Sequence, residues 1–360
     1  MRTRIRSAFI ALIAVTLAIA GLTAAISDHR ERTFEFGSSG GNVNSINKRF
    51  CCSGTLGALV ADAGGAEYIL SNNHVLARSD KAGAGEDVSQ PGLIDNGCQV
   101  HTVVADFTAA APLGSNVDAG LAELRTGLMD TTGSILEIGI PSSTTLDPAV
   151  NMGVAKSGRT TGKTTGSIGA INVSVNVQYQ AGCGQGKKFI VSYTNQVVIN
   201  SSTFSAGGDS GSLIVTNNGS RNPVALLFAG SSSTTIANPI DEVLLKLSAA
   251  LGSAVSFDVL GAPSGAAAQD ATLSDDEIAR GTRAKEAHAA RLMADPSVFA
   301  VGVGADADEP GRAAVVVYVA RGRGRGAIER RLDGVATQIV ETDPIVAYGW
   351  NEPMGGGCSR

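Results

Sequence analysis

Apolar residues in the first two thirds of the chain come in short runs that alternate with polar ones, and Gly- and Asn-rich turns separate the runs. This two-residue period is typical of β-strands. After the last run, apolar residues recur at helical spacing from Ile240 to Leu251, and Gly252 ends the predicted helix. The predicted strands are Gly54–Val60, Ala66–Leu70, Val103–Phe107, Ile171–Tyr179, Phe189–Tyr193, Gln196–Ile199, Leu213–Val215 and Val224–Gly230.

Two groups of strands closed by one helix predict a mainly β fold of two antiparallel barrels within residues 51–252. Residues 253–272 are rich in Ala, Gly, Ser and Pro and are predicted to be a linker. A capping box at Ser274–Glu277 then opens a helix, which begins a small α+β domain over residues 273–350. Its other predicted elements are strands Val298–Gly304, Ala313–Ala320 and Val335–Val340 and a short helix near Ala327–Leu332.

The N-terminus has the pattern of a secretory signal. Three arginines within the first six residues precede the apolar run Ala8–Leu22, and the small residues Thr23-Ala24-Ala25 follow. We predict a signal peptide over residues 1–25 and a polar linker over residues 26–50. The alternative is a retained anchor helix, and only in that case is a membrane partner expected. Both alternatives place the rest of the chain outside the cytoplasm.

Composition narrows the chemistry. Of 360 residues, 43% are hydrophobic but only 4% are aromatic, so the cores must be aliphatic, and a net charge of −5 gives no reason to expect nucleic acid. The five cysteines fit an oxidising compartment, and Cys52–Cys98 is the preferred disulfide because it would join the segments on either side of His74. No Cys-x-x-Cys or His pair has metal spacing, so neither a metal nor another cofactor is expected.

Part of the stretch Gly158–Thr164 imitates a phosphate-binding loop. A P-loop has four residues between its first glycine and Gly-Lys-Thr, whereas only three separate Gly158 from Gly162. The residues that follow have the period of a strand, where a P-loop requires a helix. Nucleotide binding is therefore not expected.

The stretch Phe204–Ser212 suits a nucleophile. Glycines on both sides of Ser210 allow unusual backbone angles and close approach of a substrate. The N–H groups of Gly208 and Ser210 could converge on one oxygen and form an oxyanion hole. A hairpin of Gly and Ser with no chemical role is the alternative.

A nucleophilic serine requires a base and an acid elsewhere in the chain. His74 follows a predicted strand on a turn, a position where loops carry function. Asp118 opens an apolar stretch, where a carboxylate would be partly buried and would need partners. Asp106, in the strand Val103–Phe107, satisfies the same burial argument, so the residues alone leave both acids open.

The order His74, Asp118, Ser210, together with Gly208-Asp209-Ser210-Gly211, resembles the chymotrypsin-like serine peptidases. In that family, histidine and aspartate lie in one barrel and serine in the other. The family's acid usually opens a short apolar strand, which favours Asp118 over Asp106.

Three further segments carry finer resemblances. Ser157–Gly162 looks like the start of the second barrel in bacterial members of the alpha-lytic type. Ser71–Val75 and Gln90–Gly92 are similar to the plant NARROW LEAF 1-like group and its bacterial relatives. The match covers about Cys52–Leu251.

The resemblance implies roles for individual residues. His74 would take the proton of Ser210 during attack, Asp118 would orient the imidazole, and the N–H groups of Gly208 and Ser210 would bind the oxyanion. Bacterial relatives pair the acid at Asp209 with an arginine, which implies an Arg159–Asp209 pair as structural support.

The resemblance also indicates how substrate is bound. Phe204 stands where members specific for basic residues carry an acid, so a preference for Lys or Arg is not expected. Ala229-Gly230-Ser231 is predicted to line the cleft with backbone groups and to bind substrate as an added strand. Ser212 departs from the family, because many members have a second glycine there.

These observations predict a secreted serine endopeptidase that acts on peptide or protein substrates through an acyl-enzyme. The alternatives are a peptide-binding module with a silent site, in which the C-terminal domain is the working part, and a structural protein of the cell envelope.

Overall fold

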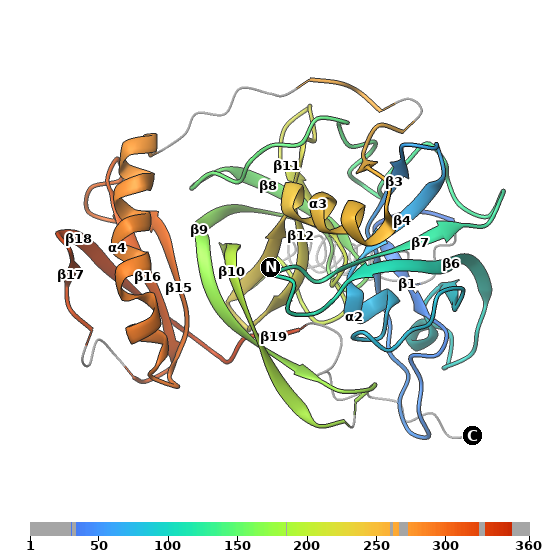
Figure 1. Ribbon diagram of the computed structural model, residues 1–360, viewed down its shortest axis with the longest axis horizontal. Helices are drawn as coiled ribbons and strands as arrows, with labels where there is room; N and C mark the ends of the chain where they lie inside the picture. Colours follow the sequence, from blue (N-terminus) through green and yellow to red (C-terminus); the bar gives the residue numbers. More distant parts are fainter. Residues whose placement is uncertain are drawn as a thin grey trace, which may run out of the picture.

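Two β-barrels and a C-terminal α+β unit lie side by side in the computed structural model (Figure 1). The structure describes residue 30 and residues 34–184, 186–259, 262–265, 273–323 and 328–347. The predicted signal peptide lies outside these residues. Within the described part of the chain, no helix has the combined length and apolar character of a membrane span.

The first barrel comes from an eight-stranded sheet in the order β14-β3-β4-β7-β6-β5-β1-β2. β2 and β3 are successive parts of one bent strand, and between them the Gly57 N–H donates to the Leu70 carbonyl at 3.0 Å. That contact brings the two ends of the sheet together. The elements are β1 (Ser38–Asn42), β2 (Gly54–Leu56), β3 (Ala58–Asp62), β4 (Glu67–Ser71), α2 (Asn73–Leu76), β5 (Asp87–Gln90), η1 (Leu93–Asp95), β6 (Thr102–Ala111), β7 (Ala119–Leu124) and β14 (Val255–Ser256).

The second barrel is closed by a ring of strands in the order β10-β13-β12-β11-β8-β9, because β9 also pairs with β10. One hydrophobic cluster of this barrel is aliphatic except for Phe204, as the composition predicts, whereas Tyr179, Tyr193 and Phe228 are buried in another. Helix α3 follows the last strand and buries Ile240, Val243 and Leu247 in the core of the first barrel, which ties the two barrels together. The elements are β8 (Gly153–Gly158), β9 (Gly162–Gln180), β10 (Lys188–Asn200), β11 (Leu213–Thr216), β12 (Pro223–Gly230), β13 (Thr234–Pro239) and α3 (Ile240–Leu251).

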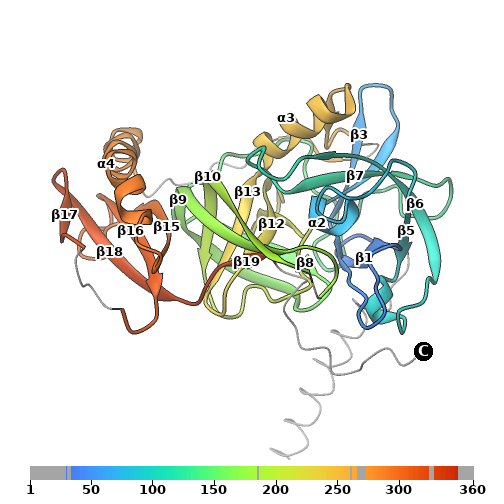
Figure 2. The ribbon, with the colours of Figure 1, turned by 60° about the horizontal axis from the view of Figure 1, so that its bottom comes forward.

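The C-terminal unit extends the sheet of the second barrel. β15 pairs with the edge of β9, where Ala300 lies opposite Val175 and Val303 opposite Ile171. Figure 2 shows the C-terminal strand β19 returning from this unit to the second barrel. The elements are α4 (Asp275–Met293), β15 (Val298–Ala305), β16 (Ala313–Ala320), β17 (Arg331–Leu332), β18 (Val335–Thr342) and β19 (Val346–Ala347).

The fold class is as predicted: mainly β, with two antiparallel barrels of the six-stranded type followed by a small α+β unit. The capped helices were also predictable. Gly252 ends α3 in the left-handed conformation at φ 76°, and the Ser274 side chain accepts a hydrogen bond from the Glu277 N–H at the start of α4.

Both predicted linkers contain structure. Within residues 26–50, β1 pairs with β2 and β5 and belongs to the first barrel. Within residues 253–272, β14 pairs with β3, and Phe257 is buried in the same core. The small polar residues of β1 carry no apolar period, whereas Val255, Phe257 and Val259 around β14 alternate with polar residues, a period that the linker prediction overlooked.

The predicted short helix near Ala327–Leu332 is also wrong in its described part. Arg331 and Leu332 form β17, an antiparallel partner of β18. Asp333 and Gly334 connect the two strands with φ angles of 47° and 79°. Asp-Gly with two positive φ angles is a typical two-residue hairpin loop, which was the stronger signal here.

The seam between β9 and β15 yields a first prediction. A Cβ at Gly302 would lie 2.6 Å from the Val173 side chain, whereas a Cβ at Gly311 would meet no described residue within 4 Å. We expect Gly302→Ala to lower the free energy of unfolding by about 1–3 kcal/mol through overpacking. Gly311→Ala, the matched control, should change it by less than about 0.5 kcal/mol. Thermal unfolding of both variants is the measurement, and equal stabilities would contradict the close seam.

Candidate active site

His74 and Asp118 form a buried pair in the first barrel. His74 lies in the one-turn helix α2, directly after β4, and Asp118 directly precedes β7, the neighbour of β4. The imidazole Nδ1 lies 2.6 Å from Asp118 Oδ2, and the His74 backbone N–H donates to Asp118 Oδ1 at 3.1 Å. The two side chains are 2% and 0% exposed, so little water competes for this contact.

The carboxylate of Asp118 is also bound from the second barrel. The Tyr179 hydroxyl donates to Asp118 Oδ2 at 2.7 Å and lies 2.7 Å from the Tyr193 hydroxyl. The Asp118 backbone is held as well, because its N–H donates to Asn238 Oδ1 and its carbonyl accepts from Asn72 Nδ2. A buried carboxylate is stable only with such donors.

Tyr179 is a site residue that the sequence analysis missed. Burial and then the charge of Asp118 hold the pKa of Tyr179 well above its usual value, so its hydroxyl stays a donor. Its ring also packs edge-on against the His74 ring, with 6.1 Å between centroids. In the sequence, only its position at the end of an alternating strand could have indicated this role, and it is 61 residues away from Asp118.

Asp106, the rival acid, lies elsewhere. Its carboxylate accepts two hydrogen bonds from Arg125, at 2.6 and 3.0 Å, and is 40% exposed. Hydrogen bonding to Arg125 lowers the pKa of Asp106. This acid therefore belongs to a surface ion pair, and it is Asp118 that contacts His74.

Ser210 lies where the second barrel meets the first. The Thr55 N–H donates to the Ser210 carbonyl at 2.8 Å, and the Thr55 hydroxyl donates to the Gly208 carbonyl at 2.9 Å. A Cβ at Gly54 would contact both the Ser210 carbonyl and the side chain of Val75, the residue next to His74. The turn that carries Ser210 and the helix that carries His74 thus lie on either side of Gly54.

Glycine makes this approach possible. Gly211 has φ 95°, and a Cβ there would collide with the Thr55 carbonyl and the Ser71 hydroxyl. Gly57, on the facing strand, would collide with the Gly211 carbonyl in the same way. These glycines let the two backbones touch, which a side chain on either would prevent.

Three backbone N–H groups of the turn around Ser210 form hydrogen bonds within the protein. The N–H groups of Asp209, Gly211 and Ser212 donate to the carbonyls of Ala206, Leu227 and Asp209. The predicted oxyanion donors are the two N–H groups that alternate with these, at Gly208 and Ser210. Gly208 has φ 97°, a conformation that disfavours other residues.

The predicted Arg159–Asp209 pair is wrong, because the cation beside Asp209 is Lys156. Its ammonium lies 3.2 Å from Asp209 Oδ2, and both side chains are 0% exposed. The lysine also donates to the Gly162 carbonyl at 2.9 Å. A lysine inside the buried strand β8 requires a partner, and that requirement was the signal in the sequence.

The segment around Arg159 contributes its backbone instead. The N–H groups of Thr160 and Thr161 donate to Asp209 Oδ1, at 2.8 and 3.2 Å. The guanidinium of Arg159 is bound by Asp95, at 2.6 and 2.7 Å, 64 residues earlier in the chain. Asp95 belongs to the first barrel and Arg159 to the second. Their ion pair therefore links the two barrels beside the Ser210 turn.

Of the predicted substrate-binding residues, Phe204 lies inside the second barrel, whereas Ala229-Gly230-Ser231 lies beside Ser210. The Phe204 side chain is fully buried in the core of the second barrel, where its ring lies beside Gly166. Ala229-Gly230-Ser231 lies at the end of β12, next to Ser210, whose hydroxyl donates to the Phe228 carbonyl at 3.3 Å.

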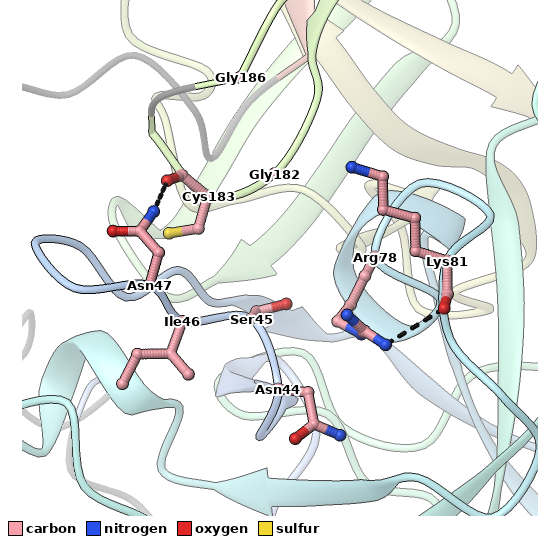
Figure 3. A pocket seen from close by; sticks show the side chains of 9 residues that line it. All are labelled: Asn44, Ser45, Ile46, Asn47, Arg78, Lys81, Gly182, Cys183 and Gly186. Carbon is pink, nitrogen blue, oxygen red and sulfur yellow. Dashed lines mark hydrogen bonds between the residues drawn. The ribbon is translucent and has the colours of Figure 1, made fainter.

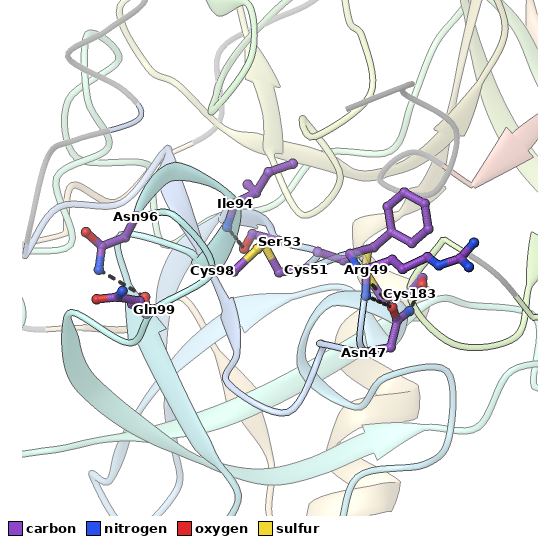
Figure 4. The surroundings of a disulfide bond; sticks show 11 residues. Asn47, Arg49, Cys51, Ser53, Ile94, Asn96, Cys98, Gln99 and Cys183 are labelled. Carbon is purple, nitrogen blue, oxygen red and sulfur yellow. Dashed lines mark hydrogen bonds between the residues drawn. A yellow bond between two sulfur atoms is a disulfide. The ribbon is translucent and has the colours of Figure 1, made fainter. Parts of the chain in front are cut away.

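The disulfides differ from the predicted Cys52–Cys98 bridge. Cys51 pairs with Cys98 (Figure 4), and Cys52 pairs with Cys183. Neighbouring side chains of an extended segment point in opposite directions, so the two adjacent cysteines reach different partners. The second bridge fastens the tip of the β9–β10 hairpin to the first barrel. Cys358 lies outside the described residues.

A hollow of about 180 Å³ lies beside this hairpin tip (Figure 3). Asn47 donates to the Cys183 carbonyl on one side of it, and Arg78 donates to the Lys81 carbonyl on the other. None of the three predicted catalytic residues lines it. The lining residues are Asn44, Ser45, Ile46, Asn47, Arg78, Lys81, Gly182, Cys183 and Gly186.

No protein-family model and no curated protein matches the chain. Its solved structural neighbours include a glutamic-acid-specific serine protease, 22% identical with TM-score 0.43, aligned over 61% of this chain and 98% of that chain. Thermobifida fusca protease A is 18% identical with TM-score 0.41, aligned over 62% and 97%. Nocardiopsis protease is 15% identical with TM-score 0.39, aligned over 54% and 90%. We therefore infer function from this chain's own geometry.

The Lys156–Asp209 pair yields a second prediction. Lys156→Met leaves a buried carboxylate without its cation, which typically costs about 3–5 kcal/mol of stability. Arg291→Met breaks an ion pair whose side chains are both 50% exposed and should cost less than about 1 kcal/mol. Chemical denaturation measures both variants. A Lys156→Met variant as stable as Arg291→Met would contradict the assignment of this pair.

The dependence of stability on pH in the acidic range yields a third prediction. Burial by itself would raise the pKa of Asp209, but the charge of Lys156 and hydrogen bonds from Thr161, Ala206 and Thr160 hold it below the usual 3.8. The stabilisation is therefore present above about pH 4 and is lost as pH falls through the folded-state pKa. The stability deficit of Asp209→Asn, measured by denaturation at several pH values, should shrink below about pH 4. A deficit independent of pH would contradict an ionised Asp209.

Proposed function

We infer that this chain is a serine endopeptidase of the chymotrypsin-like type, with Ser210 as nucleophile, His74 as general base and Asp118 as the orienting acid. The observation that carries this function is the buried 2.6 Å contact between His74 Nδ1 and Asp118 Oδ2, at the interface where the Ser210 turn packs. A histidine held in one tautomer by a buried carboxylate is the arrangement that activates a serine.

The chemistry follows from these groups. Ser210 Oγ attacks the carbonyl carbon of the peptide bond while His74 Nε2 takes the hydroxyl proton. The N–H groups of Gly208 and Ser210 stabilise the resulting oxyanion. His74 then gives its proton to the leaving amine, and a water molecule hydrolyses the acyl-enzyme by the same route in reverse. The hydrogen bond from Tyr179 keeps the carboxylate of Asp118 fixed throughout.

The finer grouping and the location are part of the same proposal. Ser71 and Asn72, which carry the resemblance to the NARROW LEAF 1-like group, bond to the Thr55 and Asp118 carbonyls beside the site. Two disulfides favour an oxidising compartment, so we place the mature protein in the cell envelope or outside the cell.

The alternative is a peptide-binding module that uses the same edge of β12 without chemistry. It requires no reactive serine. The reactivity of Ser210 therefore separates the two functions.

A fluorophosphonate probe is the fourth test. We expect the purified full chain to be labelled at Ser210, located by peptide mass spectrometry, and Ser210→Ala to remain unlabelled. Ser212→Ala is the matched control, two residues away, because the Ser212 hydroxyl is buried and has no hydrogen-bond partner among the described residues. It should keep the labelling. Labelling of another residue, or none at any incubation time, would favour the binding module.

A further inference from the structure

The edge of β12 leads directly from the nucleophile to a strand of the C-terminal segment. Leu226 pairs with β11, and the Leu227 backbone bonds to Gly211 and Ser212. The Phe228 carbonyl accepts from Ser210 Oγ. The next two positions along this edge pair with β19, Ala229 with Ala347 and Gly230 with Val346. β19 therefore occupies the edge that the proposed function assigns to substrate.

The direction of β19 is that of a substrate. β19 is antiparallel to β12, so it passes Gly230 first and Ala229 second, toward Phe228 and Ser210. A peptide bond attacked by Ser210 needs its acyl half in this orientation, because the reacting carbonyl is at the C-terminal end of that half. A strand that ran in the opposite direction would bring its N-terminal end, rather than its C-terminal end, toward Ser210.

The segment is held on both sides and along its length. The Ile345 carbonyl accepts from the Gln178 N–H of β9 at 3.0 Å, while β12 pairs with the other edge. Ile345 and Ala347 are buried, at 2% and 1% exposure, in the cluster that contains Tyr179 and Phe228.

The chain leading into the segment is tied to the same loop. The Thr342 hydroxyl lies 2.6 Å from that of Ser231, and the Ser232 hydroxyl donates to the Asp343 carboxylate. All three residues of the predicted cleft-lining segment are thus in contact with residues 342–347. Figures 1 and 2 both show the chain leaving β18 and returning to the second barrel, where β19 pairs with β12.

We propose that residues 345–347 are an intramolecular ligand of the substrate-binding edge, so that the protein is made in a self-inhibited form. The burial of the site agrees with this, because Ser210 is 0% exposed. The inhibition rests on the proposed function, while the binding of an extended peptide to β12 does not. While the segment is bound, Ser210 of the wild type is labelled only slowly, and full activity requires release of the segment by cleavage or by displacement.

The test compares full chains that differ only in this segment. Ile345→Asp with Ala347→Asp places two charges at buried positions and should expel the segment. Pro344→Asp adds a charge at the exposed neighbouring position and is the matched control. We expect the double variant to label with fluorophosphonate at least about tenfold faster than the wild type, and Pro344→Asp to label at the wild-type rate. Circular dichroism and thermal unfolding verify that each variant is folded.

A binding measurement separates this proposal from the enzymatic one. A synthetic peptide with the sequence of residues 343–350 should bind the Ser210→Ala form of the double variant saturably. The same peptide with aspartate at the positions of Ile345 and Ala347 should not bind. Binding without labelling of any variant would overturn the peptidase function and keep the site for the segment. Labelling of all variants at the same measurable rate, or absence of peptide binding, would overturn the intramolecular ligand.

Discussion

One buried carboxylate, that of Asp118, connects the parts of this molecule. Removing an ion from water costs several kcal/mol, so the fold must supply donors around it. They come from both barrels, since the His74 ring and backbone belong to the first and the Tyr179 hydroxyl to the second. The position of the imidazole therefore depends on the packing of one barrel against the other.

The position of the predicted oxyanion donors in the second barrel likewise depends on a buried carboxylate, that of Asp209. Its buried carboxylate is fixed by Lys156 and by backbone N–H groups of the segment after β8. It lies between Gly208 and Ser210, so its anchoring sets the path of the predicted oxyanion donors. Thr55 of the first barrel then bonds to the carbonyls on both sides of Asp209. Small glycine-rich surfaces, rather than large side chains, make this contact.

The sequence could predict those features that neighbouring residues determine. Helix α3 follows from its apolar period and from Gly252, and the candidate nucleophile from the glycines around Ser210. Partners far apart in the chain could not be found this way. Tyr179 meets Asp118 across 61 residues and Lys156 meets Asp209 across 53, and local patterns carry no information on such pairs. The role of β19 was hidden for the same reason, because two residues near the C-terminus have no strand signal of their own.

The tautomer of His74 tests the account most directly. The chain has four histidines, so the imidazole signals of a ¹⁵N-histidine-labelled sample can be assigned by substitution. The structure predicts that neutral His74 carries its proton on Nδ1, in a far-downfield resonance that disappears in Asp118→Asn. A neutral His74 protonated on Nε2 in the wild type would contradict the buried Asp118–His74 bond and the function built on it.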